Sequence, residues 1–218
     1  MIVILLGSPG SGKGTQAKLV TQCLGIPHVS TGDMLRDRIR HGEATTRMVA
    51  KMQSGLLVRD ELVNRLVEER LSEPDASDGF VLDGYPRTLP QAEHLDKWLE
   101  SQGVHHQVVI HLAVDYNIII ARLTGRRQCP RCGTLYNLAS QPPREDNVCD
   151  LDGTALEVRD DDRESVIRER LDAYERQTRP VLDYYRAGKS RLIEIQADNE
   201  PPETVFEKIR RALETDDC

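Results

Sequence analysis

The sequence predicts an α/β fold of three layers, in which helices cover both faces of a five-stranded parallel sheet. Short apolar segments alternate with amphipathic stretches whose apolar residues recur at helical spacing. A glycine-rich turn follows the first apolar segment, and the sequence contains no repeat or low-complexity tract. The expected strands are residues 2–6, 27–29, 80–82, 107–112 and 191–195.

The segments between these strands predict the helices that cover the sheet. A helical pattern begins at residues 16–20, and residues 61–71 and 90–101 repeat apolar side chains at helical spacing. Residues 204–213 place Val205, Ile209 and Leu213 four positions apart, so we expect a closing helix there. Strands that alternate with helices pair in parallel, because each helix returns the chain to the edge where it started.

Two segments depart from this alternation. Residues 30–58 are charged and helical and lie between the second and third strands. Residues 125–162 are polar and rich in Pro, Gly, Cys, Asp and Arg, which is typical of a small inserted module. We therefore expect one domain, residues 1–218, with these two inserts. The expected core comprises residues 1–29, 59–124 and 163–218.

The composition excludes several classes of protein. The chain has 218 residues, is 39% hydrophobic and 30% charged, and carries a net charge of -7, which disfavours a general nucleic-acid partner. The apolar run at residues 1–6 is too short for a signal peptide, and no segment is long enough to span a membrane. We therefore expect a cytoplasmic protein without a membrane partner, in which the five cysteines do not form a disulfide framework.

The turn after the first strand is typical of a phosphate-binding loop. Residues 7–15 read Gly-Ser-Pro-Gly-Ser-Gly-Lys-Gly-Thr and lead into a helix. Glycines let backbone N–H groups point inward at phosphate oxygens, and the helix adds the positive end of its dipole. Gly14 is one residue more than the strict motif allows, and a glycine-rich turn without a ligand is the alternative. The expected nucleotide contacts are Gly10, Ser11, Gly12, Lys13, Gly14 and Thr15.

Residues 125–162 contain a candidate metal site. Cys129-x2-Cys132 is followed by Cys149-x2-Asp152, and a glycine follows each pair, as in a tetrahedral site built from two tight turns. Zn²⁺ accepts both thiolate and carboxylate ligands, and four protein ligands leave no position for a substrate, so the predicted zinc is structural. Asp150 is the rival fourth ligand, whereas Cys23 and Cys218 are not expected to bind the metal.

A second motif carries a resemblance to a known family. Residues 80–87 read as a strand that ends in Asp83 and continues as Gly-Tyr-Pro-Arg. Together with residues 7–15, 30–36 and 125–127, and with Arg159-Asp160-Asp161-Asp162 followed by Arg170, this motif resembles the adenylate kinase family over nearly the whole chain. The resemblance implies a P-loop NTPase fold in which residues 30–58 bind the nucleoside monophosphate (NMP) and residues 125–162 form a zinc-bearing lid.

The resemblance also implies an activity and a set of site residues. The activity is the reversible transfer of a phosphoryl group from Mg²⁺-ATP to AMP, which gives two ADP. Catalytic roles fall on Lys13, Arg87, Arg126, Arg159, Arg170, Asp161 and Asp162. Further ATP contacts fall on Arg122, Arg126, Leu135, Tyr136 and Asn199. AMP contacts fall on Thr31, Arg36, Leu56, Leu57, Val58, Gly84, Tyr85, Pro86, Arg87, Gln91, Arg159 and Arg170.

Some of these roles are more specific. By resemblance, Asp83 orients the waters on Mg²⁺, Gln91 bonds the adenine of AMP, and Arg87 clamps its phosphate. Arg122, Arg126, Arg159 and Arg170 are expected to converge on the transferred phosphoryl group, and Asp161 and Asp162 to form the lid hinge. The family usually has a glycine near the ATP adenine where this chain has Ala197.

Two alternatives stay open at this point. A kinase for UMP, CMP or GMP would share the fold, although Thr31 favours AMP by resemblance. A nucleotide-dependent nucleic-acid module would require basic and aromatic residues around the cysteines, whereas acidic residues are frequent from 145 to 169.

We expect a monomer whose partners are ATP, AMP and ADP. His105, His106 and His111 are expected to be ordinary loop and sheet residues, and residues 214–218 a solvated end.

Overall fold

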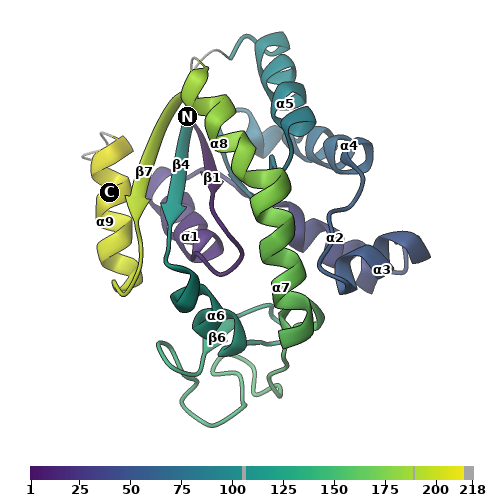
Figure 1. Cartoon of the computed structure of the whole chain (residues 1–218), viewed down its shortest axis with the longest axis vertical. Coiled ribbons are helices and arrows are strands. Elements are labelled where there is room, and N and C mark those ends of the chain that lie inside the picture. The colour runs from purple at the N-terminus through teal and green to yellow at the C-terminus, as the bar shows by residue number, and fades with distance from the viewer. Residues whose placement is uncertain (105–106, 189, 214–218) are drawn as a thin grey trace.

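The computed structural model describes residues 1–104, 107–188 and 190–213, and it has the predicted three-layer fold (Figure 1). Its main sheet is entirely parallel, with the strand order β2-β3-β1-β4-β7. The strands are β1 (Ile2–Leu6), β2 (His28–Ser30), β3 (Phe80–Asp83), β4 (Val108–Ala113) and β7 (Arg191–Gln196). All five expected strands are present, with ends that differ by one residue at most. His105, His106 and residues 214–218 lie outside the described residues.

Helices cover both faces of this sheet because both faces are apolar. Along β1, Val3 and Leu5 join the cluster under α1 (Lys13–Leu24) and α9 (Pro202–Leu213). Ile2, Ile4 and Leu6 face the opposite side, and they pack with residues of α4 (Asp60–Leu71), α5 (Leu89–Ser101) and α8 (Arg179–Ala187). A strand that is buried on both faces reads as an apolar run rather than as an alternating pattern. The expected helices at 61–71, 90–101 and 204–213 are therefore confirmed.

The first insert is helical, as expected. It contains α2 (Thr31–Arg40) and α3 (Thr46–Gln53). Ser30 and Thr45 precede these helices, and their side-chain oxygens accept hydrogen bonds from the amides of Asp33 and Met48 at 3.3 and 3.2 Å. In Figure 1, α3 projects to the right of the sheet and away from α1 and α9. The insert thus forms one wall beside the carboxyl ends of the strands.

The second insert forms a small unit at the bottom of Figure 1, next to α6 (Tyr116–Thr124). Its strands β5 (Arg126–Gln128) and β6 (Leu135–Asn137) pair antiparallel. Cys129, Cys149 and two larger side chains, Tyr136 and Leu156, make up its buried cluster. Such a cluster is too small to stabilise a unit of this length by burial alone.

The chain returns from the lid to the sheet through one long helical segment. α7 (Glu164–Ala173) continues into a π-helical turn (Tyr174–Thr178) and then into α8. In Figure 1 this segment runs from the lid along the front of the sheet. Among the described residues, no helix combines the length and the apolar character needed to cross a membrane.

Candidate functional site

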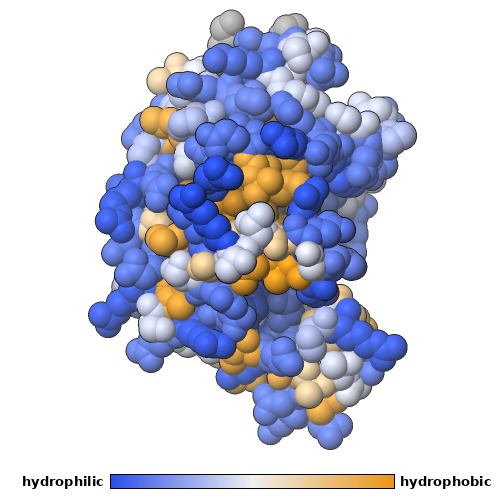
Figure 2. Space-filling view, turned by 90° about the vertical axis from the view of Figure 1, so that its right-hand side faces the viewer, coloured by the Kyte–Doolittle hydropathy of each residue, from blue (hydrophilic) through white to orange (hydrophobic). Residues whose placement is uncertain are grey.

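A cleft of about 1000 Å³ opens at the carboxyl ends of the parallel strands. The phosphate loop, the two inserts (predicted as the NMP-binding region and the lid) and the segment 197–205 all contribute to its wall. The space-filling view shows the lid as a lobe at the lower end, with the surface hollowed above it (Figure 2). Carboxyl ends of parallel strands are the usual ligand edge of open α/β sheets, so the cleft is the candidate site.

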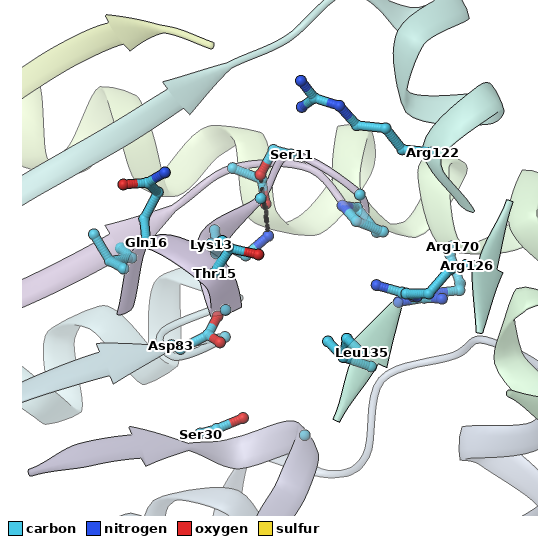
Figure 3. Close-up of a pocket in the computed structure, with 18 of the residues that line it drawn as sticks. Ser11, Lys13, Thr15, Gln16, Ser30, Asp83, Arg122, Arg126, Leu135 and Arg170 are labelled. Atoms are coloured by element: carbon cyan, nitrogen blue, oxygen red, sulfur yellow. Dashed lines mark hydrogen bonds between the residues drawn. The ribbon is translucent and has the colours of Figure 1, made fainter. Parts of the chain in front are cut away.

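The phosphate loop has the geometry that its sequence predicts. Gly12 adopts a left-handed conformation with φ of 97° and caps α1 through its carbonyl, which accepts bonds from the amides of Thr15 and Gln16 at 3.0 Å. Lys13 Nζ donates to the carbonyls of Gly7 and Ser8 at 2.8 Å, and to Ser11 Oγ at 3.4 Å (Figure 3). The lysine therefore already bridges the loop into which phosphates would fit.

The electrostatic setting of Lys13 disfavours its positive charge in the absence of an anion. Burial, together with the nearby guanidinium groups of Arg87, Arg170 and Arg126, lowers the pKa of Lys13 to about 7, although the charge of Asp83 opposes this shift. A bound polyphosphate would remove this imbalance by supplying negative charge.

Asp83 lies at the end of β3 beside this loop. Burial alone would raise the pKa of the Asp83 carboxyl, but the close His28 ring and the charge of Lys13 bring it below its usual value. His28 Nε2 lies 3.4 Å from Asp83 Oδ2. A Cβ atom at Gly14 would lie 3.3 Å from the same oxygen, which gives a steric reason for the extra glycine in the motif. An ionised carboxylate at this place suits the water shell of Mg²⁺, which retains several waters when it binds phosphates.

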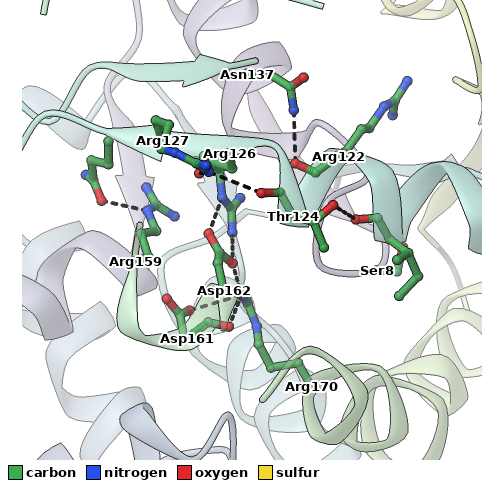
Figure 4. A network of polar contacts seen from close by, with 12 residues as sticks. Ser8, Arg122, Thr124, Arg126, Arg127, Asn137, Arg159, Asp161, Asp162 and Arg170 are labelled. Carbon is green, nitrogen blue, oxygen red and sulfur yellow. Dashed lines mark hydrogen bonds and ion pairs between the residues drawn. The ribbon is translucent and has the colours of Figure 1, made fainter. Parts of the chain in front are cut away.

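A network of acids and arginines joins the lid to α7 (Figure 4). The carboxylate of Asp162 is fully buried and accepts hydrogen bonds from Arg126 of β5 and from Arg170 of α7. Arg170 also donates to the carbonyl of Asp161 at 2.9 Å. Burial would lower the pKa of Arg126, but the hydrogen bonds and the charge of Asp162 raise it, so Arg126 stays charged. Asp162 thus holds together two of the predicted catalytic arginines from opposite sides of the lid boundary.

We expect the substitution Asp162→Asn to lower the free energy of unfolding by about 3 kcal/mol, because it leaves two buried guanidinium groups without their shared carboxylate. Urea denaturation followed by circular dichroism measures this change. The matched control is Asp160→Asn, since Asp160 pairs with Arg163 at an exposed position and its loss should cost less than about 0.5 kcal/mol. Equal losses in the two variants would contradict the role assigned to Asp162.

Other arginines face the cleft with fewer partners. Arg159 donates to Gln128 Oε1 at 2.6 Å, and burial together with Arg126 and Arg36 lowers its pKa to about 9. Arg87 donates to the carbonyl of Gly84 at 2.7 Å, and burial beside Arg170 lowers its pKa as well. Guanidinium groups are normally charged throughout the physiological range, and here burial first and neighbouring arginines second disfavour that charge, so a bound anion would stabilise it.

Arg122 also lines the cleft, but it lies apart from these arginines and has partners of its own. Its Nη2 donates to the carbonyl of Ala197 at 2.8 Å and also to the carbonyl of Asp198. Figure 3 shows Arg122 apart from Arg126 and Arg170. The reason is the segment after β7, whose free carbonyls lie within reach of α6 and bind the guanidinium. Arg122 therefore belongs to the end of the cleft near residues 197–199.

The predicted AMP residues gather on the other wall. The Thr31 hydroxyl is buried and donates to the carbonyl of Gly84 at 2.7 Å, and Arg36 pairs with Asp33 at 2.6 Å. Tyr85 lies behind the wall, where its hydroxyl donates to Asn64 Oδ1 at 2.8 Å. The predicted residues that line the cleft on this side are Thr31, Arg36, Leu56, Leu57, Val58, Gly84, Pro86, Arg87 and Gln91.

The same cleft collects most of the other predicted site residues. Among the predicted nucleotide-binding and catalytic residues, Tyr85 and Asp162 are buried outside its lining. The lining on the ATP and transfer side includes Gly10, Ser11, Gly12, Lys13, Gly14, Thr15, Asp83, Arg122, Arg126, Leu135, Tyr136, Arg159, Asp161, Arg170 and Asn199. Residues from stretches that lie far apart in the sequence thus meet in one cavity.

The lid brings together three thiols and one carboxylate. One ligand atom from each of Cys129, Cys132, Cys149 and Asp152 lies within 4.8 Å of all the others. The pairs Cys129–Cys132 and Cys149–Asp152 lie in two turns of the same kind. In these turns the amides of Gly133 and Gly153 donate to the carbonyls of Cys129 and Cys149 at 3.0 and 2.9 Å. This donor set is compatible with zinc.

Asp150, the rival fourth ligand, points elsewhere. Its Oδ1 accepts a hydrogen bond from the amide of Arg144 at 2.9 Å. It is not part of the cluster of potential metal ligands among the described residues. The x2 spacing that favoured Asp152 therefore agrees with the geometry.

The sequence did not point to several residues that shape the site. Gln16 Nε2 donates to the carbonyl of Pro202 at 2.9 Å, and Asn137 Nδ2 donates to the carbonyl of Arg122 at 3.0 Å. Asp60 binds the side chains of Thr88 and Gln91. His28, beside Asp83, was also missed, although a histidine in an expected strand is a visible signal. Gln16, Asn137 and Asp60 leave no local signal, because their roles depend on contacts between distant segments.

Taken together, the phosphate loop, the ionised acid on the adjacent strand and the arginines across the cleft define a P-loop phosphotransferase. Residues 5–190 match the sequence profile of the family described as adenylate kinase. The chain is 46% identical to the adenylate kinase of Thermoanaerobacter sp. (strain X514) over 214 residues, which cover 98% of each chain. It is 46% identical to that of Anaeromyxobacter dehalogenans (strain 2CP-C) over 202 residues, which cover 92% of this chain and 94% of the relative.

The chain therefore belongs to the adenylate kinase family, as the resemblance predicted. It is a phosphotransferase of the nucleoside monophosphate kinase class.

Proposed function

We propose that this chain transfers the terminal phosphoryl group of Mg²⁺-ATP to AMP and so forms two ADP, reversibly and without a covalent intermediate. The observation that carries the proposal is the meeting of Lys13, Arg87 and Arg159 in one cleft between a phosphate loop and an apolar pocket. Two polyphosphate substrates repel each other, and several fixed positive charges are needed to bring them in line.

On the ATP side, the amides of residues 10–15 hold the β-phosphate and Lys13 reaches toward the transferred group. Arg122 and Asn199 lie at the far end of the cleft, where the nucleoside of ATP would fit, and Leu135 and Tyr136 of the lid face the same cavity. Asp83 would hold the waters of Mg²⁺, which supplies charge neutralisation at the β- and γ-phosphates.

On the AMP side, Arg36 and Arg87 bind the phosphate, while Leu56, Leu57 and Val58 contact the base. Thr31 and residues 84–86 shape the pocket around the base, and Gln91 bonds its edge. Arg126, Arg159 and Arg170 stabilise the charge on the phosphoryl group in flight, with Asp161 and Asp162 as the hinge of the lid.

Further parts of the proposal concern the lid, the domain division and the cellular setting. Zn²⁺ bound by Cys129, Cys132, Cys149 and Asp152 would act as a structural staple, because all four positions are filled by protein. We retain residues 30–58 as the NMP-binding region, 125–162 as the lid and the remainder as one core. We also propose that the protein is a cytoplasmic monomer that binds neither nucleic acid nor membranes.

ADP formation by the purified protein, with Mg²⁺-ATP and each monophosphate in turn, tests the proposed acceptor. We expect rapid turnover with AMP and little with UMP, CMP or GMP. Strong turnover with one of these others would keep the phosphotransferase and overturn the acceptor. The alternative acceptors are not favoured by the relatives, which are named adenylate kinases.

We expect ATP binding to take up a proton near pH 8. Burial holds the pKa of Lys13 at about 7 in the free protein, and phosphate oxygens would raise it, so a proton enters whenever the pH lies between the two values. Titration calorimetry at pH 8, in buffers of different ionisation enthalpy, measures the uptake. The Lys13→Met variant should bind without it, and equal uptake in both proteins would contradict the assignment.

A further inference from the structure

The side-chain amide of Gln91 is held on both sides. Its Oε1 accepts a hydrogen bond from the backbone amide of Arg87 at 2.7 Å, and its Nε2 donates to Asp60 Oδ1 at 2.6 Å. Gln91 is only 2% exposed, yet it lines the cleft. A backbone N–H can only donate and a carboxylate can only accept, so the two partners together permit a single orientation of the amide.

Asp60 is itself fixed by the segment that carries Gln91. It is the first residue of α4, and its second oxygen, Oδ2, accepts the hydroxyl proton of Thr88 at 2.9 Å. The Thr88 oxygen also caps α5 by accepting from the Gln91 amide at 3.3 Å. Asp60 therefore ties the start of α4 to the first turn of α5, with both carboxylate oxygens occupied by donors from that turn.

The fixed orientation leaves the amide with one acceptor and one donor for a ligand. The Oε1 atom keeps one lone pair and Nε2 keeps one hydrogen, because each has used one of its two positions. Adenine presents an amino donor at C6 and an acceptor at N1, which match this pair. A 6-oxopurine, such as hypoxanthine or guanine, presents a carbonyl acceptor at C6 and an N–H donor at N1, so acceptor would meet acceptor and donor would meet donor.

We propose that Asp60 is the positioning residue that selects adenine over 6-oxopurines, by holding Gln91 Nε2 and so preventing rotation of the amide. The inference rests on the proposed function, in which Gln91 meets the base of AMP. Rotating the amide by half a turn would exchange its donor and acceptor and would fit the wrong base. In the rotated form, Gln91 Oε1 would face the Asp60 carboxylate and Nε2 would face the Arg87 amide, so both hydrogen bonds would be lost. Without Asp60, the rotated form loses only the bond to Arg87, and the clash between two acceptors is gone.

The test compares AMP with inosine monophosphate (IMP), which has the same outline as AMP and differs in the reversed donor and acceptor at C6 and N1. We expect the wild-type protein to prefer AMP by at least ~100-fold in kcat/KM, since a polar site strongly rejects an analogue that leaves its groups unpaired. In Asp60→Leu the preference should fall at least about tenfold. The KM for AMP should rise, while the KM for ATP changes little.

Two further variants separate positioning from a loss of stability. Thr88→Val removes the cap of α5 and one bond to Asp60 but leaves the Asp60–Gln91 bond, so it should lower the melting temperature and keep the preference for AMP. Asp60→Asn can still offer Oδ1 to Gln91 while its Nδ2 donates to the Thr88 oxygen. We expect it to keep the preference within about threefold, as the acceptor and not the charge holds the amide.

An unchanged ratio of AMP to IMP in Asp60→Leu would overturn the inference, as would a loss of preference in Thr88→Val or Asp60→Asn equal to that in Asp60→Leu. The proposed function fails separately. If the wild-type protein forms no ADP from AMP, the acceptor itself is wrong. If it uses AMP and Asp60→Leu retains the full preference, the role of Asp60 is wrong and the proposed function stands.

Discussion

The substitution Lys13→Met is expected to reduce kcat/KM by roughly 10³-fold while leaving the fold stable. Lys13 bridges the carbonyls of Gly7 and Ser8, and its ammonium is the cation that this loop itself provides for phosphates. Methionine has a similar length and no charge, so the transferred group loses a positive partner in a buried setting where each charge counts most.

The stability of this variant should change little. The lowered pKa of Lys13 means that burial opposes its charge, so removing the charge offsets the loss of its three hydrogen bonds. Initial rates of ADP formation and the melting temperature measure the two effects in the same samples. Lys97→Met, at an exposed position on α5, is the control and should affect neither. A fall in melting temperature that accounts for the lost activity would contradict this assignment.

The substitution Cys129→Ser is expected to cost far more thermal stability than turnover. The lid contains only a small buried cluster, so a metal held by Cys129, Cys132, Cys149 and Asp152 would supply much of its folding free energy. We expect the zinc content to fall and the melting temperature to drop by at least about 10 °C, given 2–4 °C per kcal/mol for a chain of this size. Well below the melting temperature, kcat should fall much less, because none of these four residues lines the cleft.

The two aspartates of the lid provide matched controls for this prediction. Asp152→Asn should lose zinc, whereas Asp150→Asn should keep it, because Asp150 binds the amide of Arg144 and lies outside the cluster. Metal analysis and differential scanning calorimetry on the three variants measure both quantities. Proportional losses of stability and kcat in Cys129→Ser, with zinc retained, would contradict a structural metal.

Much of the site could be predicted because its residues stand in short motifs. Residues 7–15 and the Cys-x2-Cys pair carry their geometry in local spacing, since glycine conformations and turn lengths act over a few residues. Asp83 and Arg87 follow a strand whose end is marked by its apolar run. The resemblance added roles for arginines that no spacing rule would single out.

The partners of Arg122 could not be predicted from the sequence, for a physical reason. Its place on α6 brings it near the other arginines in sequence, but the carbonyls of Ala197 and Asp198, about 75 residues away, bind its guanidinium instead. Asp60 was missed for the same kind of reason, as its partners Thr88 and Gln91 belong to another helix. Long polar side chains bind the groups that lie near them in the folded chain, and the sequence pattern does not encode these distances.

The sequence by itself determined the α/β class, the five strands, the phosphate loop, the metal-binding spacing and the family, because apolar periodicity and glycine-rich turns are local properties. Only the tertiary structure decided the strand order, the division of the arginines between Asp162 and the open cleft, and the orientation of Gln91. These features depend on which distant groups share a buried space, and there each donor must find an acceptor and each charge a counter-charge.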